Sequence, residues 1–298
     1  INHMPELASL GITDSKILLL DPLVGKESLK ELVLVDNGEV RDYNPVGTLT
    51  GLETLVINKY TSQEDPDLTA LTGLKHGEFH GMMGIRFLGS LTGLEELKVQ
   101  GCNVDQPSVI ASLPALKKLT YRKNWGNSDD LSFLAGCQGL TCLDMNHSEF
   151  YGDVSYAFNL PALETLILDS SSFEVKFDRL QDNPALKALS LNHVKLYKNI
   201  EMWSDGMVRS INYDDVLLDD YTSFLGHYPS LEYLSLRGNQ LTDLQFAAGL
   251  KNLRELDVTD NYVTDTHVLD QLEYLGKDST VKRPMADVDW IDTVEDSH

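Results

Sequence analysis

The sequence predicts an elongated repeat solenoid of the α/β type, in which parallel strands line one concave face. The first observation is a spacing, Leu-x-x-Leu-x-Leu-x-x-Asn, over residues 231–239, which recurs over residues 253–261 with valine at its third apolar position. The second is the period, because these two frames lie 22 residues apart. Such a period is typical of units that hold one short strand and a return segment, and that bury their apolar sides only by stacking.

The same frame can be traced toward the N-terminus in steps of 20 to 24 residues. A third observation supports it, since a recurring return segment precedes the frames: Leu-Thr-Gly-Leu, Leu-Pro-Ala-Leu, Pro-Ala-Leu or Pro-Ser-Leu. The convex side is therefore expected to be irregular or short-helical. The eleven frames begin at Leu29, Leu52, Leu74, Leu94, Leu116, Leu140, Leu163, Leu186, Val208, Leu231 and Leu253.

One elongated domain is expected. Apolar residues 22 positions ahead of the first frame indicate a degenerate repeat, and apolar residues on a helical period after Asp265 indicate a helix over the last strand. In the third repeat, Gly77 replaces a core leucine, which favours a bend there. The expected parts are an N-terminal cap with a degenerate repeat (5–28), an array of about 11 repeats (29–263), a C-terminal capping helix (264–275) and an acidic tail (276–298).

The repeats resemble those of the leucine-rich repeat superfamily, and within it the repeats of roughly 22 residues found in bacterial internalins. The most similar stretch is NQLTDLQFAAGLKNLRELDV, residues 239–258. The resemblance implies a horseshoe with a parallel concave sheet that binds a protein or receptor. It supplies no binding motif that transfers to this chain residue by residue.

The last position of each frame is polar in the family and forms a ladder along the turns. We expect buried side chains here that bond the backbone of the turns. The frame has substitutions at this position in the middle of the chain, at Tyr60, Met82, Ser148, Ser171, Val194 and Val216. The residues expected to form the ladder are Asn37, Cys102, Asn124, Asn239 and Asn261.

Charge limits the class of partner. The chain carries 46 acidic and 24 basic residues, a formal net charge of -22, which repels nucleic acid and anionic lipid and favours a protein partner. No stretch reaches the roughly 18 apolar residues that span a bilayer. The opening Ile-Asn-His-Met resembles a cloning remnant, so we presume that a leader was removed and expect an extracellular or cell-surface monomer, with a cytoplasmic location as the alternative. The three cysteines do not have a metal-binding spacing, and a Cys137–Cys142 disulfide is left open.

Alternate strand residues share the concave face, so its composition can be written from the frame. Between the fourth and eighth repeats this face is polar and of mixed charge. Lys98 is expected to pair with Glu78, whereas Arg122 has only Gln100 and Asn146 beside it at its own position and is expected to be uncommitted. The candidate binding residues are Lys98, Lys118, Arg122, Asp144, Asn146, Asp169 and Asn192.

Other sites were weighed against this surface. His76 and His80 lie roughly 13 Å apart along one strand, too far for one ion, so neither a metal nor a cofactor is expected. The sequence contains no known enzyme signature motif, so we expect no catalytic residues. Alternative contact surfaces are the edge near Trp125 and the valine patch formed by Val33, Val35 and Val56.

The sequence thus favours a non-enzymatic module for protein–protein interaction, from a bacterial surface or secreted protein. A second hypothesis is an intracellular regulatory scaffold, similar to leucine-rich subunits that regulate phosphatases. A hydrolase that uses the acidic residues of the concave face is a distant third.

Overall fold

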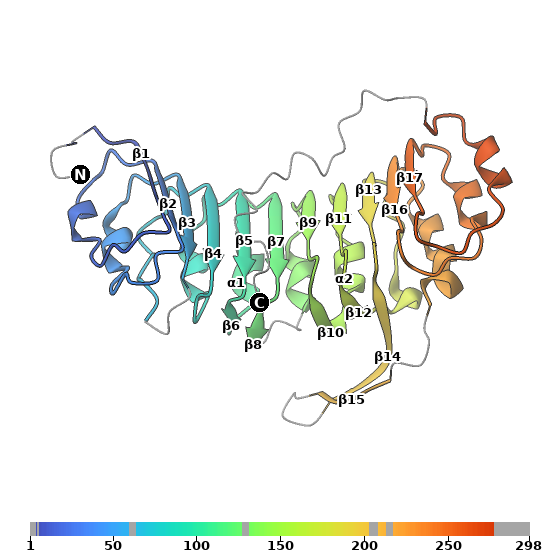
Figure 1. Ribbon diagram of the computed structural model, residues 1–298, viewed down its shortest axis with the longest axis horizontal. Helices are drawn as coiled ribbons and strands as arrows, with labels where there is room; N and C mark the ends of the chain where they lie inside the picture. Colours follow the sequence, from blue (N-terminus) through green and yellow to red (C-terminus); the bar gives the residue numbers. More distant parts are fainter. Residues whose placement is uncertain are drawn as a thin grey trace.

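In the computed structural model, the described residues are 4, 6–59, 64–126, 131–202, 208–212 and 217–276. They form a curved array in which strands lie side by side along one face and short helical segments lie behind them (Figure 1). Among these residues one sheet has eleven strands in chain order. They are β1 (Ser9–Thr13), β2 (Glu31–Val35), β3 (Thr54–Asn58), β4 (His76–His80), β5 (Glu96–Gln100), β7 (Lys118–Arg122), β9 (Cys142–Asp144), β11 (Thr165–Ile167), β13 (Ala188–Ser190), β16 (Tyr233–Ser235) and β17 (Glu255–Asp257).

Equivalent positions of successive repeats pair in this sheet, and the pairing is parallel throughout. Leu32 is opposite Leu55, and Leu234 is opposite Leu256. The sequence prediction of a parallel concave sheet is therefore confirmed. The degenerate repeat of the N-terminal segment supplies β1, whose Leu10 is opposite Leu32.

The frame at Val208 does not belong to this sheet, which corrects the sequence prediction. β13 pairs directly with β16, and Val208 begins β15 (Val208–Asn212), which runs antiparallel to β14 (Lys195–Met202). A hairpin is thus inserted into the repeat that begins at Leu186. The sequence carries two signals for it: an Asp-Gly pair at 205–206, typical of hairpin turns, and no Pro-x-Leu or Gly-Leu segment before Val208.

Two smaller sheets lie beyond the ends of the concave strands (Figure 1). β6 (Asn103–Val104) pairs with β8 (Trp125–Gly126). The other contains β10 (Glu149–Asp153), β12 (Ser172–Glu174), β14 and β15. These sheets continue the stacking of repeats past the turn that ends each concave strand.

The convex side of the described chain is short-helical, as the sequence predicts. At the C-terminal end of the array, Asp265 accepts a hydrogen bond from the backbone N–H of His267. Where the sequence predicts a capping helix over 264–275, the structure has a 3-10 turn of five residues that buries Val268. The segments are η1 (Asp21–Leu23), η2 (Asn44–Thr48), η3 (Arg86–Ser90), α1 (Ser108–Ala111), η4 (Leu131–Gly136), α2 (Ser155–Phe158), η5 (Phe177–Arg179), η6 (Leu218–His227), η7 (Gln245–Gly249) and η8 (His267–Gln271).

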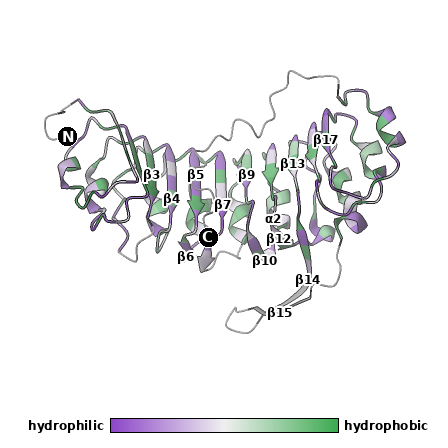
Figure 2. Cartoon of the chain, viewed as in Figure 1, coloured by the Kyte–Doolittle hydropathy of each residue, from purple (hydrophilic) through white to green (hydrophobic). Residues whose placement is uncertain are grey.

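Leucines at the repeated positions fill one continuous core between the sheet and the convex segments. Leu29, Leu32 and Leu34 of the first full frame are each 0 % exposed. Apolar and polar residues alternate along the strands, since one side of each strand packs on this core (Figure 2). Gly77 leaves no void, because the ring of Phe79 lies 2.7 Å from where a Cβ would be and packs edge-on against Phe87. β4 pairs in register with both neighbours, so the glycine does not interrupt the strand pairing.

Candidate binding surface

Side chains of the ladder join each turn to the turn before it. Asn37 donates from Nδ2 to the carbonyl oxygen of Ile12 (2.6 Å) and accepts from the N–H of Ser15 (3.2 Å). Asn124 repeats this with Val99 (3.1 Å) and Cys102 (3.0 Å). Asparagine suits this position because its side-chain amide can both donate and accept a hydrogen bond. It therefore pairs with one backbone carbonyl and one backbone N–H that the turn leaves unpaired.

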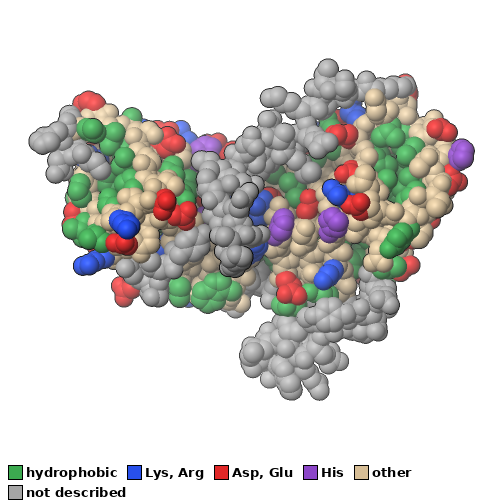
Figure 3. Space-filling model, viewed as in Figure 1, with side chains coloured by type: hydrophobic (Ala, Val, Ile, Leu, Met, Phe, Trp, Pro, Cys, Tyr) green, Lys and Arg blue, Asp and Glu red, His purple; other side chains and the backbone are tan. Residues whose placement is uncertain are grey.

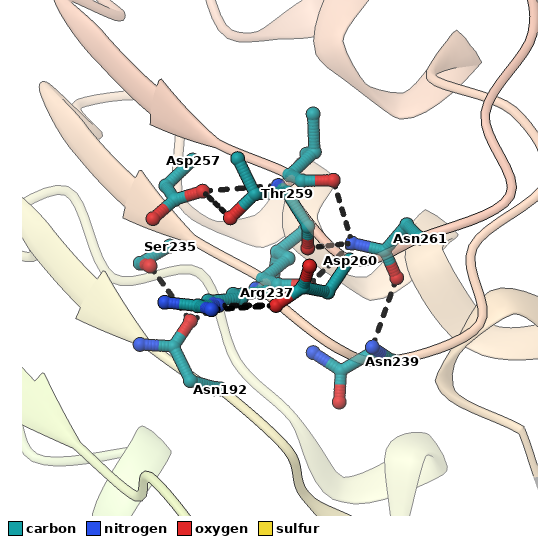
Figure 4. Close-up of polar contacts among 10 residues, drawn as sticks. Asn192, Ser235, Arg237, Asn239, Asp257, Thr259, Asp260 and Asn261 are labelled. Atoms are coloured by element: carbon teal, nitrogen blue, oxygen red, sulfur yellow. Dashed lines mark hydrogen bonds and ion pairs between the residues drawn. The ribbon is translucent and has the colours of Figure 1, made fainter.

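The ladder continues across the hairpin insertion. Asn239 donates to the carbonyl of Leu191, 48 residues earlier, and accepts from the N–H of Val194. Asn261 then accepts from the N–H of Asn239 (2.9 Å) and donates to the carbonyl of Leu236 (2.9 Å), as Figure 4 shows in part. Asn239 is 5 % exposed, whereas Asn261 at the end of the array is half-buried.

Smaller polar groups carry the ladder through its middle, where asparagine is replaced. The hydroxyl of Ser171 donates to the carbonyl of Met145 (2.9 Å) and accepts from the N–H of Ser148 (3.1 Å). The thiol of Cys102 lies 3.3 Å from the carbonyl oxygen of Phe79. Ser148 and Ser171 were missed as ladder residues, although a hydroxyl can also donate and accept at once. Two of the substituted positions, Tyr60 and Val216, lie outside the described residues.

The residue before the ladder adopts a left-handed conformation in repeat after repeat. The angle φ is 55° at Asp36, 48° at Lys123, 49° at His147, 51° at His193 and 57° at Asp260. This turn reverses the chain at the end of each strand and brings the ladder side chain inward. Asp and Gly at this position are a signal that the sequence offered, since these residue types tolerate the conformation.

Lys98 lies in a buried cluster of charged groups at the centre of the concave sheet. Its ammonium is 3.0 Å from Oε1 of Glu78, and Nε2 of His80 is 2.6 Å from the same oxygen. Burial works to raise the pKa of Glu78, but the hydrogen bond to His80 and the charge of Lys98 outweigh it and hold the pKa below its ordinary value. The pair expected from the sequence is present, and it leaves Lys98 only 3 % exposed.

Lys118 belongs to a second, more exposed group at the start of the strands. Its ammonium lies 2.8 Å from Oε1 of Glu96, whose Oε2 is 3.2 Å from Nδ1 of His76. Glu96 therefore bridges two strands, β4 and β7, across its own. Both histidines weighed as metal ligands have a carboxylate partner, and among the described residues no three His, Cys, Asp or Glu side chains lie close enough to hold a metal ion.

Arg122 is not uncommitted, which corrects the sequence prediction. Its guanidinium forms two bonds with the carboxylate of Asp144, Nη2 to Oδ2 and Nε to Oδ1 (3.3 Å). In the parallel register Asp144 is opposite Thr120, so this contact is diagonal. The sequence reading compared only like positions of neighbouring strands, and long side chains also reach the diagonal neighbour.

A third group joins the later strands. Oδ1 of Asp169 accepts from the hydroxyl of Ser190 (2.6 Å) and from the N–H of Asn192, while Nδ2 of Asn192 donates to Oδ2 (3.1 Å). Oδ1 of Asn192 accepts in turn from Ser235 (2.7 Å) and from the N–H of Arg237 (2.8 Å; Figure 4). Ser190, Ser235 and Arg237 were not among the candidates from sequence.

The candidate residues thus fall into separate paired groups on one continuous face. Lys98 and Asp144 are buried and support their partners from below. The remaining candidates are half-buried, and among them Asn146 has a buried side-chain oxygen, Oδ1, without a hydrogen-bond partner. They are Lys118, Arg122, Asn146, Asp169 and Asn192. Figure 3 shows acidic, basic and histidine side chains close together in the middle of the view.

The structure also places the other features that the sequence suggested. Val33 and Val56 are half-buried and Val35 is 5 % exposed, so the valine patch presents little surface. Cys137 and Cys142 are free thiols, not a disulfide, and burial raises the pKa of each to about 11. In the described chain no helix has the length and apolar content to cross a membrane. The acidic tail from residue 277 lies outside the described residues.

Comparisons with known proteins agree with this architecture. A family model described as "Leucine Rich repeats (2 copies)" matches residues 229–271. No curated protein matches by sequence. Similar solved structures include the internalin inlF of Listeria monocytogenes (16 % identity, 92 % of this chain and 87 % of that one, TM-score 0.62) and a leucine-rich repeat protein of Leptospira interrogans (17 %, 92 % and 84 %, 0.57).

A plant peptide hormone receptor, RGFR1 in complex with RGF2, is also similar (16 % identity, TM-score 0.58), with 91 % of this chain aligned to 47 % of that one. At such identities the likeness concerns the fold. The chain has the fold of leucine-rich repeat proteins, and its residues 229–271 match that family by sequence. Within that superfamily it resembles the internalins.

Proposed function

We propose that this protein is a non-enzymatic binding module that holds a protein partner against its concave sheet. The contact surface is formed by Lys118, Arg122, Asn146, Asp169 and Asn192. The buried residues Lys98 and Asp144 lie beneath this surface and hold their charged partners in place. The observation that carries the proposal is the pairing of these groups along rigid neighbouring strands. Each charged side chain is already oriented by a partner, so little rotamer entropy is lost when a ligand docks.

The mixed charge of this surface suits a protein partner. Polar groups of both signs on a fixed scaffold discriminate between partners and guide association more than they add affinity. The fold supports the same role, since leucine-rich repeat proteins are typically interaction modules. One similar structure is a plant peptide hormone receptor in complex with RGF2, and another is the ectodomain of a plant receptor kinase in complex with Casparian strip integrity factor 2.

We further propose that the module works at a cell surface or outside the cell. This rests on the internalin and the receptor ectodomain among the similar structures. The intracellular regulatory scaffold is the competing proposal. Fusing the native N-terminal coding region to a reporter and locating the product distinguishes the two, because only the first requires export.

A charge exchange tests the concave surface. The double variant R122E/D144K keeps an ion pair but reverses its polarity, so the fold is retained while the surface is changed. For a partner captured from host cell-surface proteins, we expect binding to weaken at least about tenfold, which corresponds to about 1.4 kcal/mol. Affinity is measured by surface plasmon resonance on the purified pair.

The matched control exchanges an ion pair at the convex side. Arg86, at the start of η3, lies 2.6 Å from Asp105, and R86E/D105K makes the same change in charge away from the sheet. We expect this variant to bind as the parent does. Equal affinities of the parent and R122E/D144K would exclude the central concave surface as the site.

A further inference from the structure

The two consecutive repeats that contain β8 and β10 are not paired with each other in the small sheets. At the turn they are joined, because the N–H of Lys123 donates to the hydroxyl of Ser148 (3.0 Å). Further on, β8 pairs only with β6, and β10 pairs only with β12, so the described strands have a break between β8 and β10 (Figure 1). Elsewhere the corresponding bonds are present, such as the N–H of Trp125 to Cys102 and that of Ser172 to Ser148.

A bulge in β10 explains the break. Glu149 is opposite Ser172 and Asp153 is opposite Glu174, so four steps along β10 match two steps along β12. The two extra residues bend β10, as bulges do at the edges of sheets. The result is a groove of about 470 Å³, within the range of roughly 300 to 1,000 Å³ for small-ligand sites.

Aromatic rings flank this groove on both sides. Trp125 contributes from β8 and is 49 % exposed, although an indole ring is usually buried. Tyr151 contributes from β10, and its ring stacks on that of Tyr197 (centroids 6.1 Å apart, 11° between planes). The wall that holds Tyr151 is therefore rigid.

One carboxylate lies among these rings. Glu149 lines the groove, and the hydroxyl of Tyr197 donates to its Oε1, which fixes the side chain. Within the described part of the chain Glu149 has no cationic partner, whereas Glu78, Glu96 and Asp144 on the concave sheet each have one. An oriented carboxylate beside aromatic faces is an arrangement that attracts a cation.

We propose that this groove binds an arginine or lysine side chain of a protein partner. The cationic head pairs with Glu149 and lies over Trp125, and the aliphatic stem lies between the two aromatic walls. Lys123 and His147 line the groove at the turn, where the repeats are joined, so the cation enters from the opposite end. The net charge of -22 favours approach of a basic segment.

A short peptide tests this without the natural partner. The probe is acetyl-Gly-Gly-Arg-Gly-Gly-amide, and its control replaces arginine by citrulline, which has nearly the same shape and no charge. We expect the arginine peptide to bind at least about tenfold more tightly at low salt, as measured from NMR shifts of the Trp125 indole N–H, assigned with W125F. A lysine peptide is expected to bind as well.

Two variants locate the binding. E149Q is expected to abolish the preference for arginine over citrulline. E273Q removes one negative charge from an exposed residue near the C-terminal end of the array and is expected to retain that preference. Equal binding of both peptides to the parent, or an equal loss in the two variants, would overturn the proposal, and so would a failure of the arginine peptide to bind.

The concave-surface proposal is tested separately. Neither Arg122 nor Asp144 lines the groove, so R122E/D144K should bind the arginine peptide as the parent does even when it no longer binds a concave partner. Loss of peptide binding in E149Q with retention in R122E/D144K supports two independent sites. Loss in R122E/D144K with retention in E149Q would place the peptide on the concave sheet and contradict the groove.

Discussion

Arg122 on β7 and Asp144 on β9 hold each other across a diagonal of the concave sheet, with two bonds between guanidinium and carboxylate. The side chain of Asp144 is only 3 % exposed and that of Arg122 is 18 % exposed, so the pair is largely shielded from water. Removing one partner therefore leaves a buried charge alone, which is costly in a poorly solvated site.

This relationship gives the first prediction. R122A should lower the free energy of unfolding by about 3 kcal/mol, whereas R122E/D144K should recover most of that loss because it restores a pair. Urea unfolding followed by circular dichroism measures both. A double variant no more stable than the single one would mean that the site fits the pair in one orientation only.

The ladder gives the second prediction, which depends on burial. Asn239→Leu should destabilise the protein by about 1 to 3 kcal/mol, because it leaves the carbonyl of Leu191 and the N–H of Val194 without partners. Asn261→Leu should cost less, since that side chain is half-buried and water can replace it. Thermal melting compares the two, with the exposed Asn252→Leu as the control. Equal melting temperatures for all three would contradict the ladder.

The third prediction concerns acid. The pKa of Glu78 is lower in the folded chain than its ordinary value of 4.5, so the folded state binds a proton less readily than the unfolded state. The stabilisation by Glu78 is then fully present above about pH 4.5 and is lost as the pH falls through the lower, folded pKa. Glu78→Gln should thus be less stable than the parent at neutral pH, and the difference should shrink as the pH falls below the ordinary pKa of 4.5.

This difference is measured from urea midpoints between neutral and acidic pH. Glu273→Gln controls for the general loss of an acidic residue, because Glu273 is exposed. A gap between parent and Glu78→Gln that stays constant over the whole range would show that Glu78 has the same pKa in both states.

The fourth prediction concerns the thiols. Burial raises the pKa of Cys102, Cys137 and Cys142 to about 11, so at about pH 8 only about one thiol in a thousand is a thiolate in the folded protein. Reaction with Ellman's reagent should be at least about a hundredfold slower in the native state than in urea. The native protein should nevertheless release three thiols on unfolding without a reductant, because no disulfide is present. Release of one thiol would instead reveal a disulfide.

Short-range pattern was sufficient to predict the solenoid. The spacing of leucines is a local property of the sequence. A unit made of one strand and one turn can bury these leucines only by packing against neighbouring units of the same kind. For this reason β2 and β17 could be predicted from their own residues. The hairpin of β14 and β15 could not be found by the same search, because Val208 and Ile211 satisfy the apolar spacing on a strand that pairs elsewhere.

What the tertiary structure decided is which polar groups meet. The sequence placed Arg122 and Asp144 on one face, but their pairing depends on a diagonal reach between strands that are 22 residues apart in sequence. The groove beside Trp125 depends on a bulge that displaces β10 from its neighbour. Gly152 within that strand is a residue type that often marks a bulge, but it does not tell which neighbouring strand loses its pairing. The burial of the leucines follows from a pattern that every repeat carries in its own sequence. The polar contacts depend instead on how neighbouring repeats are offset, on bulges in their strands and on the reach of their side chains. These features exist only once the repeats are stacked.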